Sequence, residues 1–360
     1  MALNRSFTLN DGRVIPAIGL GTFLSKPDEV TKSVEIAANV GYKHFDLATC
    51  YQNEHEVGIA LSNLKKANPN FKREDLWLTG KTWNSFHRQE HITKGLDQTL
   101  KDLGTDYLDL YLVHWPVHFK PEPSPDGKNA VNLNPLSTDP ANPDVAEIAL
   151  DTELSCTEVW KSMIQLRETG KVKSIGVSNF PVRILKTIIA ETGVVPAVNQ
   201  VEAHPLLLQD DLVEYCKEQN IHISAYAPLG NNLQGELRII DHDVVKKLAA
   251  ELGKTPAQVL IAYGVKRGYS VLPKSVTESR IRSNFEDFEL PDDAYNQLVE
   301  LGRKQPLTVA SQGIPCHSAE FPVRHLGYLP WCLTPSDRST CLKPRHYEGL
   351  SDELPIECRS

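Results

Sequence analysis

Residues 44–54 read HFDLATCYQNE. The stretch lies in a short, largely apolar run and contains an acidic residue, Asp46, with Tyr51 five positions further on. Apolar runs of this length are typical of buried β-strands. A carboxyl group and a phenol at the end of such a strand are either capping groups or functional ones, and the rest of the chain shows which is favoured.

Strand-like runs recur eight times along the chain, separated by longer segments with helical spacing. This alternation predicts parallel strands joined by crossover helices. Eight such units close a (β/α)8 TIM barrel, which is the predicted α/β fold. The predicted strands are residues 17–23, 44–48, 76–82, 107–114, 172–178, 197–202, 221–228 and 269–274.

The segment at residues 87–103 illustrates the predicted helices. Ile92, Leu96, Leu100 and Leu103 recur at intervals of four, four and three, which places them on one face of a helix. Gly104 is expected to end it. Before the first strand, residues 7–16 (FTLNDGRVIP) hold an Asn-Asp-Gly turn between two β-prone runs, which predicts an N-terminal hairpin that plugs one end of the barrel.

Two segments interrupt the alternation. Residues 118–153 contain six prolines and are too long for an ordinary loop, so they are interpreted as an insertion after the fourth strand. Residues 305–360 contain seven prolines and no sustained periodicity, which predicts an irregular tail after a barrel spanning residues 1–304. The tail also carries Cys316, Cys332, Cys341 and Cys358, whose wide spacing matches no zinc pattern, and no metal site is predicted.

Composition narrows the function classes. The chain has 360 residues and a formal charge of −8, from 38 basic and 46 acidic residues, which argues against nucleic acid as a partner. No apolar run approaches the roughly 20 residues of a membrane helix. The first residues lack a basic region followed by an apolar core, so we expect a cytosolic protein without a secretory signal. Separately, we expect a monomer or a weak dimer.

Four polar residues stand at the ends of three successive predicted strands. Asp46 and Tyr51 follow the second, Lys81 ends the third and His114 ends the fourth. Active sites of such barrels lie at the carboxyl ends of the strands, so we expect these side chains in one mouth.

Together, these four residues can make the tyrosine a proton donor. A tyrosine with a pKa of ~10 releases its proton more readily beside an ammonium such as that of Lys81. Asp46 would keep this buried lysine charged. His114 would orient a substrate oxygen. Taken singly, each residue has a simpler explanation, because an Asp or His at a strand end more often caps the backbone and a Tyr more often packs in the core.

Seven motifs in order resemble the aldo-keto reductase family: GLGTF, FDLATCYQNE, TGKTW, LVHWP, GVSNF, NQVE and LPKSVTESRIRSNF. The resemblance runs from about residue 7 to residue 303 and implies a catalytic tetrad of Asp46, Tyr51, Lys81 and His114. It also implies the reaction, in which hydride passes between a nicotinamide and a carbonyl carbon while the tyrosine protonates the oxygen.

The resemblance further implies a dinucleotide site. Ser178, Asn179 and Gln200 correspond to residues that bind the carboxamide, and Tyr226 to the aromatic residue that stacks on the nicotinamide. Gly21, Thr22 and Leu229 are expected to belong to the same site. Residues of the LPKSVTESRIRSN segment would hold the adenosine phosphate and the adenine: Lys274, Ser275, Val276, Arg280 and Asn284.

Two cations near a helix N-terminus suit an extra 2′-phosphate, so NADPH is favoured over NADH. A solvated helix start is the simpler explanation for Arg282. Phe23, Trp83 and Trp115 would surround the substrate. Many similar enzymes carry Trp where Phe23 stands, which implies a roomier pocket here.

The sequence therefore predicts an NADPH-dependent reductase of a small aldehyde or ketone. Its insertion and its LPKSVTESRI segment resemble eukaryotic, especially fungal, glycerol or glyceraldehyde-type reductases. A dedicated ketone reductase of a secondary-metabolite pathway would have the same features. A barrel that binds NADPH but serves a regulatory role is the alternative from another class, and the intact tetrad argues against it.

Overall fold

The computed structural model describes residues 3–125, 127, 131–134, 136–139, 142–230 and 238–306. Its centre is a sheet of eight parallel strands in the order β12-β11-β10-β9-β6-β5-β4-β3. The strands are β3 (Gly19–Gly21), β4 (His44–Asp46), β5 (Trp77–Thr82), β6 (Leu108–Val113), β9 (Val172–Ser178), β10 (Val198–Glu202), β11 (His222–Tyr226) and β12 (Ser270–Leu272). Each lies within or overlaps a predicted strand.

The first and last strands meet and close the barrel. Ile18 pairs with Val271 in a parallel bridge, and the amide of Val271 donates to the carbonyl of Ala17 at 2.8 Å. The amide of Gly21 donates to the carbonyl of Pro273 at 3.2 Å. The predicted (β/α)8 barrel is thus confirmed.

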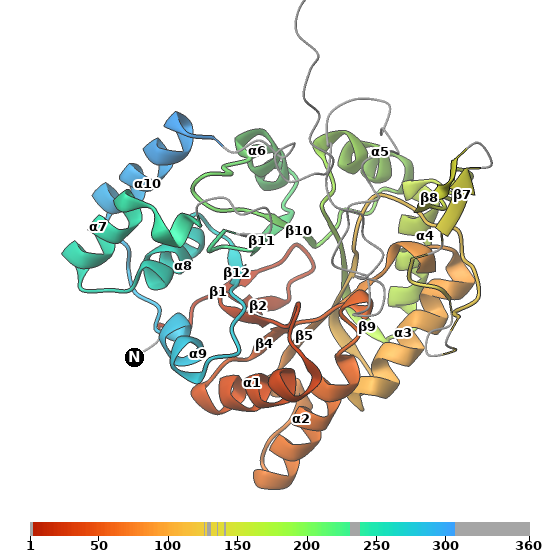
Figure 1. The fold of residues 1–360 in the computed structure, drawn as a ribbon, viewed down its shortest axis with the longest axis horizontal. Helices are drawn as coiled ribbons and strands as arrows, with labels where there is room; N and C mark the ends of the chain where they lie inside the picture. The colour runs from red at the N-terminus through yellow and green to blue at the C-terminus, as the bar shows by residue number, and fades with distance from the viewer. Residues whose placement is uncertain are drawn as a thin grey trace, which may run out of the picture.

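Helices surround the strands, as Figure 1 shows. They are α1 (Pro27–Val40), α2 (Glu54–Ala67), α3 (Gln89–Leu103), α4 (Cys156–Glu168), α5 (Val182–Thr192), α6 (Asp210–Glu218), α7 (Asp243–Leu252), α8 (Pro256–Lys266), α9 (Glu278–Phe285) and α10 (Asp292–Lys304). Short 3₁₀ turns occur at Thr49–Tyr51, Arg73–Asp75, Asn84–Phe86 and Ile239–Asp241.

Helix α3 confirms the predicted apolar stripe, because Ile92, Leu96, Leu100 and Leu103 are all buried. It ends at Gly104, which has a φ of 65° and donates its amide to the carbonyl of Leu100. A positive φ is easily adopted only by glycine, so this residue stops the helix at low cost.

The predicted N-terminal hairpin is also present. β1 (Ser6–Thr8) and β2 (Val14–Pro16) pair antiparallel. Leu9 and Ile15 are buried in a cluster with Trp77, Leu110 and Leu112 of the barrel strands. Residues from β5 and β6 in this cluster show that the hairpin covers one end of the barrel, as expected.

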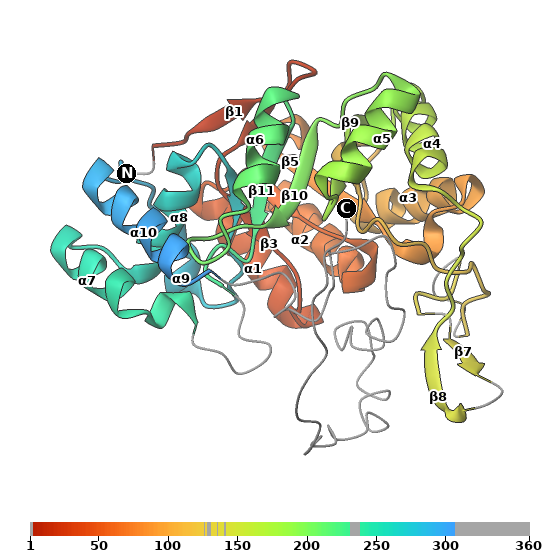
Figure 2. The same ribbon diagram turned by 90° about the horizontal axis from the view of Figure 1, so that it is seen from above.

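The insertion after β6 has more order than its prolines suggest. β7 (Leu136–Asp139) and β8 (Asn142–Ile148) pair antiparallel, and Phe119 pairs with Leu150 at the base. Figure 2 shows β1 of the hairpin and the β7–β8 pair at opposite ends of the barrel. β7 and β8 were not predicted, since prolines and polar residues obscure a strand pattern.

The expected tail at residues 305–360, with its four cysteines, lies outside the described residues from residue 307 onward. In the part of the chain that is described, no helix has the length and apolar character needed to cross a membrane.

Candidate active site

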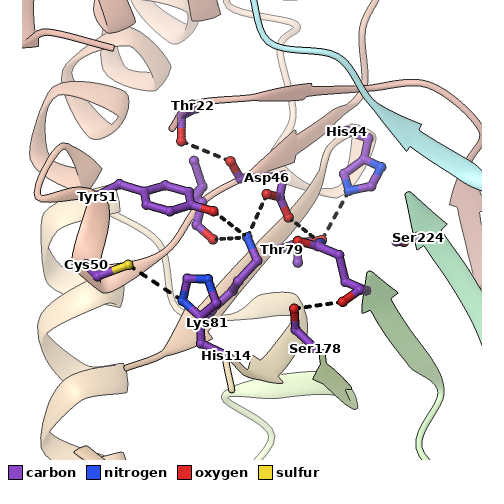
Figure 3. A network of polar contacts seen from close by, with 12 residues as sticks. Thr22, His44, Asp46, Cys50, Tyr51, Thr79, Lys81, His114, Ser178 and Ser224 are labelled. Carbon is purple, nitrogen blue, oxygen red and sulfur yellow. Dashed lines mark hydrogen bonds and ion pairs between the residues drawn. The ribbon is translucent and has the colours of Figure 1, made fainter. Parts of the chain in front are cut away.

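Four polar side chains predicted from the sequence come together at the carboxyl ends of neighbouring strands (Figure 3). Asp46 is the last residue of β4, Lys81 lies in β5, and His114 follows β6 directly. Tyr51 ends the 3₁₀ turn Thr49–Tyr51, which β4 leads into. Adjacent parallel strands therefore deliver these groups to one mouth of the barrel.

Lys81 is the centre of the arrangement. Its Nζ donates to Asp46 Oδ2 at 2.6 Å, to the carbonyl of Leu47 at 2.9 Å and to the Tyr51 hydroxyl at 3.3 Å. The ammonium has three protons, and three acceptors surround it. The buried charge is thus both paired and hydrogen-bonded, which is the condition for keeping it in the barrel.

Asp46 is held on its other side as well. Oδ1 accepts from the Gln200 amide at 2.7 Å, and the main-chain carbonyl accepts from the Thr22 hydroxyl at 2.9 Å. Gln200 lies on β10, across the barrel, and Thr22 follows β3. Lys81 of β5 and Gln200 of β10 each bind one carboxylate oxygen, and Thr22 binds the main chain of the same residue, so the carboxylate that faces Lys81 is fixed in position.

His114 is held as a neutral ring. Burial, followed by the nearby charge of Lys81 and then His87, keeps the pKa of His114 well below its ordinary value. Its ring meets Trp83 edge-on at 5.2 Å and Tyr51 edge-on at 5.9 Å between centroids. Trp115 stacks on it at 6.4 Å. A neutral imidazole can donate one hydrogen bond and accept another.

Ser178 and Asn179, at the end of β9, lie beside the tetrad. Asn179 has a φ of 63°, and its amide Nδ2 donates to the carbonyl of His114 at 3.1 Å and to Ser178 Oγ at 3.1 Å. Its Oδ1 accepts from the Tyr226 hydroxyl at 2.9 Å. Ser178 Oγ donates to the carbonyl of Gln200 at 2.8 Å. The three residues expected to bind the carboxamide, and the tyrosine expected to stack on the nicotinamide, are therefore brought together.

The segment after β12 lies against the end of β3. A Cβ on Gly21 would be 3.4 Å from the carbonyl oxygen of Leu272 and 3.6 Å from Lys274 Cβ. The two segments of the backbone therefore approach closely. Leu229 is half-buried and packs against the core.

The remaining predicted dinucleotide residues lie on helix α9 and in the segment just before it. Ser275 Oγ accepts from the amide of Thr277, the N-cap of α9, at 3.2 Å. Lys274, Val276 and Arg280 are exposed and Asn284 is buried. Although the Lys274 side chain reaches solvent, nearby atoms partly desolvate its ammonium and lower its pKa, while Glu29 acts in the opposite direction. Arg282 forms an ion pair with Glu278 at 2.7 Å, in accord with the simpler explanation given for it.

Aromatic residues line the neighbourhood of Tyr51. The Phe23 ring lies 5.0 Å from the Tyr51 ring. Trp83 is 2% exposed, and its indole Nε1 donates to the carbonyl of Leu133, in the insertion, at 2.7 Å. Trp115 and Tyr51 pack against the same apolar cluster as Trp83. The insertion thus contacts the candidate substrate pocket.

Some residues of the site were missed. The thiol of Cys50 lies 3.6 Å from His114 Nδ1. Asn53 Nδ2 donates to the carbonyls of Thr22 and Ser25, at 3.0 and 3.2 Å, and so holds the loop that carries Phe23. Both lie within the opening motif, but sequence spacing does not show contacts between distant segments. Within the described ranges, no group of three or more His, Cys, Asp or Glu side chains is arranged to hold a metal ion.

Comparisons with known proteins agree with this geometry. Residues 17–303 match the model of the aldo/keto reductase family. A D/L-glyceraldehyde reductase of Hypocrea jecorina is 44% identical over 310 residues, 84% of this chain and 89% of that protein. A glycerol 2-dehydrogenase (NADP(+)) of the same organism is 38% identical over 312 residues, 83% of this chain and 92% of that protein.

A solved structure extends the likeness to three dimensions. The aldose reductase of Schistosoma japonicum aligns with a TM-score of 0.74 and 37% identity, covering 91% of this chain and 98% of that one. The family model spans the barrel from the first strand to α10, and the relatives are similar over most of their own length. The chain belongs to the aldo/keto reductase family of oxidoreductases, whose members act on carbonyl and alcohol groups.

Proposed function

We propose that the chain reduces a small aldehyde or ketone with NADPH, and that Tyr51 is the proton donor. The observation that carries this proposal is the position of Lys81, whose ammonium bridges the Asp46 carboxylate at 2.6 Å and the Tyr51 hydroxyl at 3.3 Å. A buried ammonium beside a phenol stabilises the phenolate, which is the form that remains after proton transfer.

Each of the four residues has a distinct task in this reaction. Tyr51 gives its hydroxyl proton to the carbonyl oxygen as negative charge develops there. Lys81 stabilises the phenolate, and Asp46 keeps Lys81 charged inside the barrel. His114 is neutral and can donate a hydrogen bond to the same oxygen, which orients the carbonyl and stabilises the developing alkoxide. The reverse reaction oxidises the alcohol through the same groups.

The residues present fit a dinucleotide with an additional phosphate. Lys274 and Arg280 provide two exposed cations around the start of α9, where backbone amides also favour anions. Ser178, Asn179 and Gln200 offer amide and hydroxyl groups to a carboxamide, and the Tyr226 ring would stack on the nicotinamide. Gly21, Thr22, Leu229, Ser275, Val276 and Asn284 complete the proposed site. When bound, NADPH supplies the hydride.

The substrate class follows from the aromatic surroundings and the relatives. Phe23, Trp83 and Trp115 would admit a carbonyl compound of modest size and exclude water. Relatives carry the names of glyceraldehyde, galacturonate and glycerol enzymes, so small polyhydroxy carbonyl compounds are the first choice. We expect a cytosolic protein that acts as a monomer or a weak dimer.

A substrate panel tests this function. Purified protein is mixed with NADPH and with glyceraldehyde, dihydroxyacetone, galacturonate or a simple aromatic aldehyde, and loss of the reduced nicotinamide absorbance is followed. Turnover well above that of a Tyr51→Phe variant supports the proposal. Tight binding of NADPH with no turnover above this variant would instead assign the chain to the non-catalytic regulatory barrels.

A further inference from the structure

Cys50 makes a contact that places it next to the proposed chemistry. Its Sγ lies 3.6 Å from His114 Nδ1, and Figure 3 shows the thiol pointing toward the imidazole ring. Cys50 is 7% exposed and belongs to an apolar cluster with Ala48, Trp83 and Phe86. The thiol therefore reaches one nitrogen of the ring that is proposed to bind the substrate oxygen.

The surroundings of His114 fix its ring and leave one property undecided. Trp83 and Tyr51 meet the ring edge-on, Trp115 stacks on it, and Asn179 holds the main-chain carbonyl. The ring is neutral, as described above, so only one of its two nitrogens carries a proton. Which nitrogen does so decides whether Nε2 donates or accepts a hydrogen bond.

The chemistry of the pair favours one direction. Apolar surroundings disfavour a thiolate, and Cys50 lies in an apolar cluster, so the sulfur carries a proton. An unprotonated imidazole nitrogen is a good acceptor, whereas a thiol sulfur is a weak one. The S–H group of Cys50 therefore donates to Nδ1, and the ring proton is then on Nε2.

We propose that Cys50 is a positioning residue that holds His114 in the Nε2–H tautomer and so presents a donor to the carbonyl oxygen. This inference rests on the proposed function of His114. Its consequence is specific: the thiol acts on the reaction only through the imidazole, and any group that donates to Nδ1 from position 50 replaces it.

Two substitutions separate this role from packing. Cys50→Val keeps a similar volume and removes the donor, while Cys50→Ser keeps a donor and adds polarity to an apolar cluster. If Cys50 only packs, Val is the better replacement in every assay. If Cys50 sets the tautomer, Ser has the higher kcat although Val has the higher melting temperature. The expected fall in kcat for Val is about 2- to 10-fold, the value of one hydrogen bond, with the KM for NADPH unchanged.

Nuclear magnetic resonance of ¹⁵N-histidine-labelled protein measures the tautomer directly. Long-range proton–nitrogen correlations distinguish the two ring nitrogens, and a His114→Asn variant assigns the signal. We expect His114 to be protonated on Nε2 in the wild type and in Cys50→Ser, and to lose this uniform state in Cys50→Val. Cys216→Val, in the main core, is the matched control and should leave the His114 signals unchanged.

These experiments distinguish a failure of the Cys50 inference from a failure of the proposed function. An Nδ1–H tautomer in the wild type overturns the inference without any variant, as does a Cys50→Val protein with unchanged tautomer and unchanged kcat. Folding of each variant is checked by its melting temperature, and the wild-type spectrum decides if Cys50→Val does not fold. Absence of carbonyl turnover in the wild type would overturn the proposed function, while the ring signals would still report whether Cys50 donates to His114.

Discussion

The ammonium of Lys81 lies 2.6 Å from the carboxylate of Asp46, and the two side chains are 0% and 5% exposed. This is a buried ion pair, in which each charge offsets the cost of removing the other from water. Its effect on stability is best seen when one partner is removed, because the remaining charge then has no counterion in a region that water does not reach.

Asp46→Asn should lower the free energy of unfolding by about 3–5 kcal/mol, since it leaves the buried Lys81 ammonium without a carboxylate. Urea denaturation measures this. The matched control is Asp97→Asn, which removes an exposed ion pair with Lys171 of the same 2.6 Å length. That change should cost about 0–1 kcal/mol. Similar losses in the two variants would contradict the interpretation of the Lys81–Asp46 pair.

Tyr51→Phe should lower kcat by about 10²- to 10⁴-fold, because it removes the proposed proton donor and leaves the ring in place. The melting temperature and the affinity for NADPH should change little. Tyr107→Phe is the control, since Tyr107 lies under the Arg73 guanidinium, outside the tetrad. A Tyr51→Phe enzyme that retains wild-type kcat would show that another group supplies the proton.

Arg280→Ala should raise the dissociation constant of NADPH about 10-fold and leave that of NADH nearly unchanged, because NADH lacks the 2′-phosphate. Quenching of tryptophan fluorescence measures both. Arg282→Ala is the control on the same helix, where the guanidinium is already paired with Glu278. An equal effect on the two dinucleotides would remove the argument for NADPH preference.

The stability of the protein should fall as the pH decreases from about 6.5 to about 4. Burial lowers the pKa of His44 to about 4, although Asp46 acts in the opposite direction. The unfolded chain then binds more protons than the folded one, so stability rises with pH through this window and is lost below it. At pH 5, protonation of His44 in the unfolded chain lowers the free energy of unfolding by about 2 kcal/mol relative to neutral pH.

Urea denaturation of His44→Gln at pH 7 and pH 5 tests this contribution. The difference in stability between the two pH values should be smaller than in the wild type. His55→Gln, which changes an exposed histidine on α2, should leave that difference unchanged. An unchanged difference in His44→Gln would show that this histidine does not couple folding to protonation.

The barrel and the placement of the tetrad at its mouth were predictable, because both depend on patterns in the local sequence. Apolar runs mark the strands, and a polar residue at the end of a strand has a fixed place in a parallel barrel. The positions of Asp46 and Lys81 near the ends of successive strands were therefore enough to predict that the two side chains lie close together.

Contacts between segments with no shared periodicity were not predictable. The Cys50–His114 contact depends on the exact turn that follows β4, and the Trp83–Leu133 bond depends on how the insertion folds back. β7 and β8 were missed because β7 is mostly polar and Pro143 interrupts β8. Sequence pattern thus located the groups, and only the three-dimensional structure showed which of them touch.

The hydrogen bond from Trp83 joins the insertion through the main-chain carbonyl of Leu133 and not through a side chain. Every residue type has that carbonyl, so substitutions at position 133 leave the acceptor in place. The bond therefore does not depend on the side chain at position 133, although Leu133 itself packs in the apolar cluster around Trp83. For an engineer, we expect a library at this position to vary the apolar surface beside Trp83 while the attachment of the insertion to the barrel is kept.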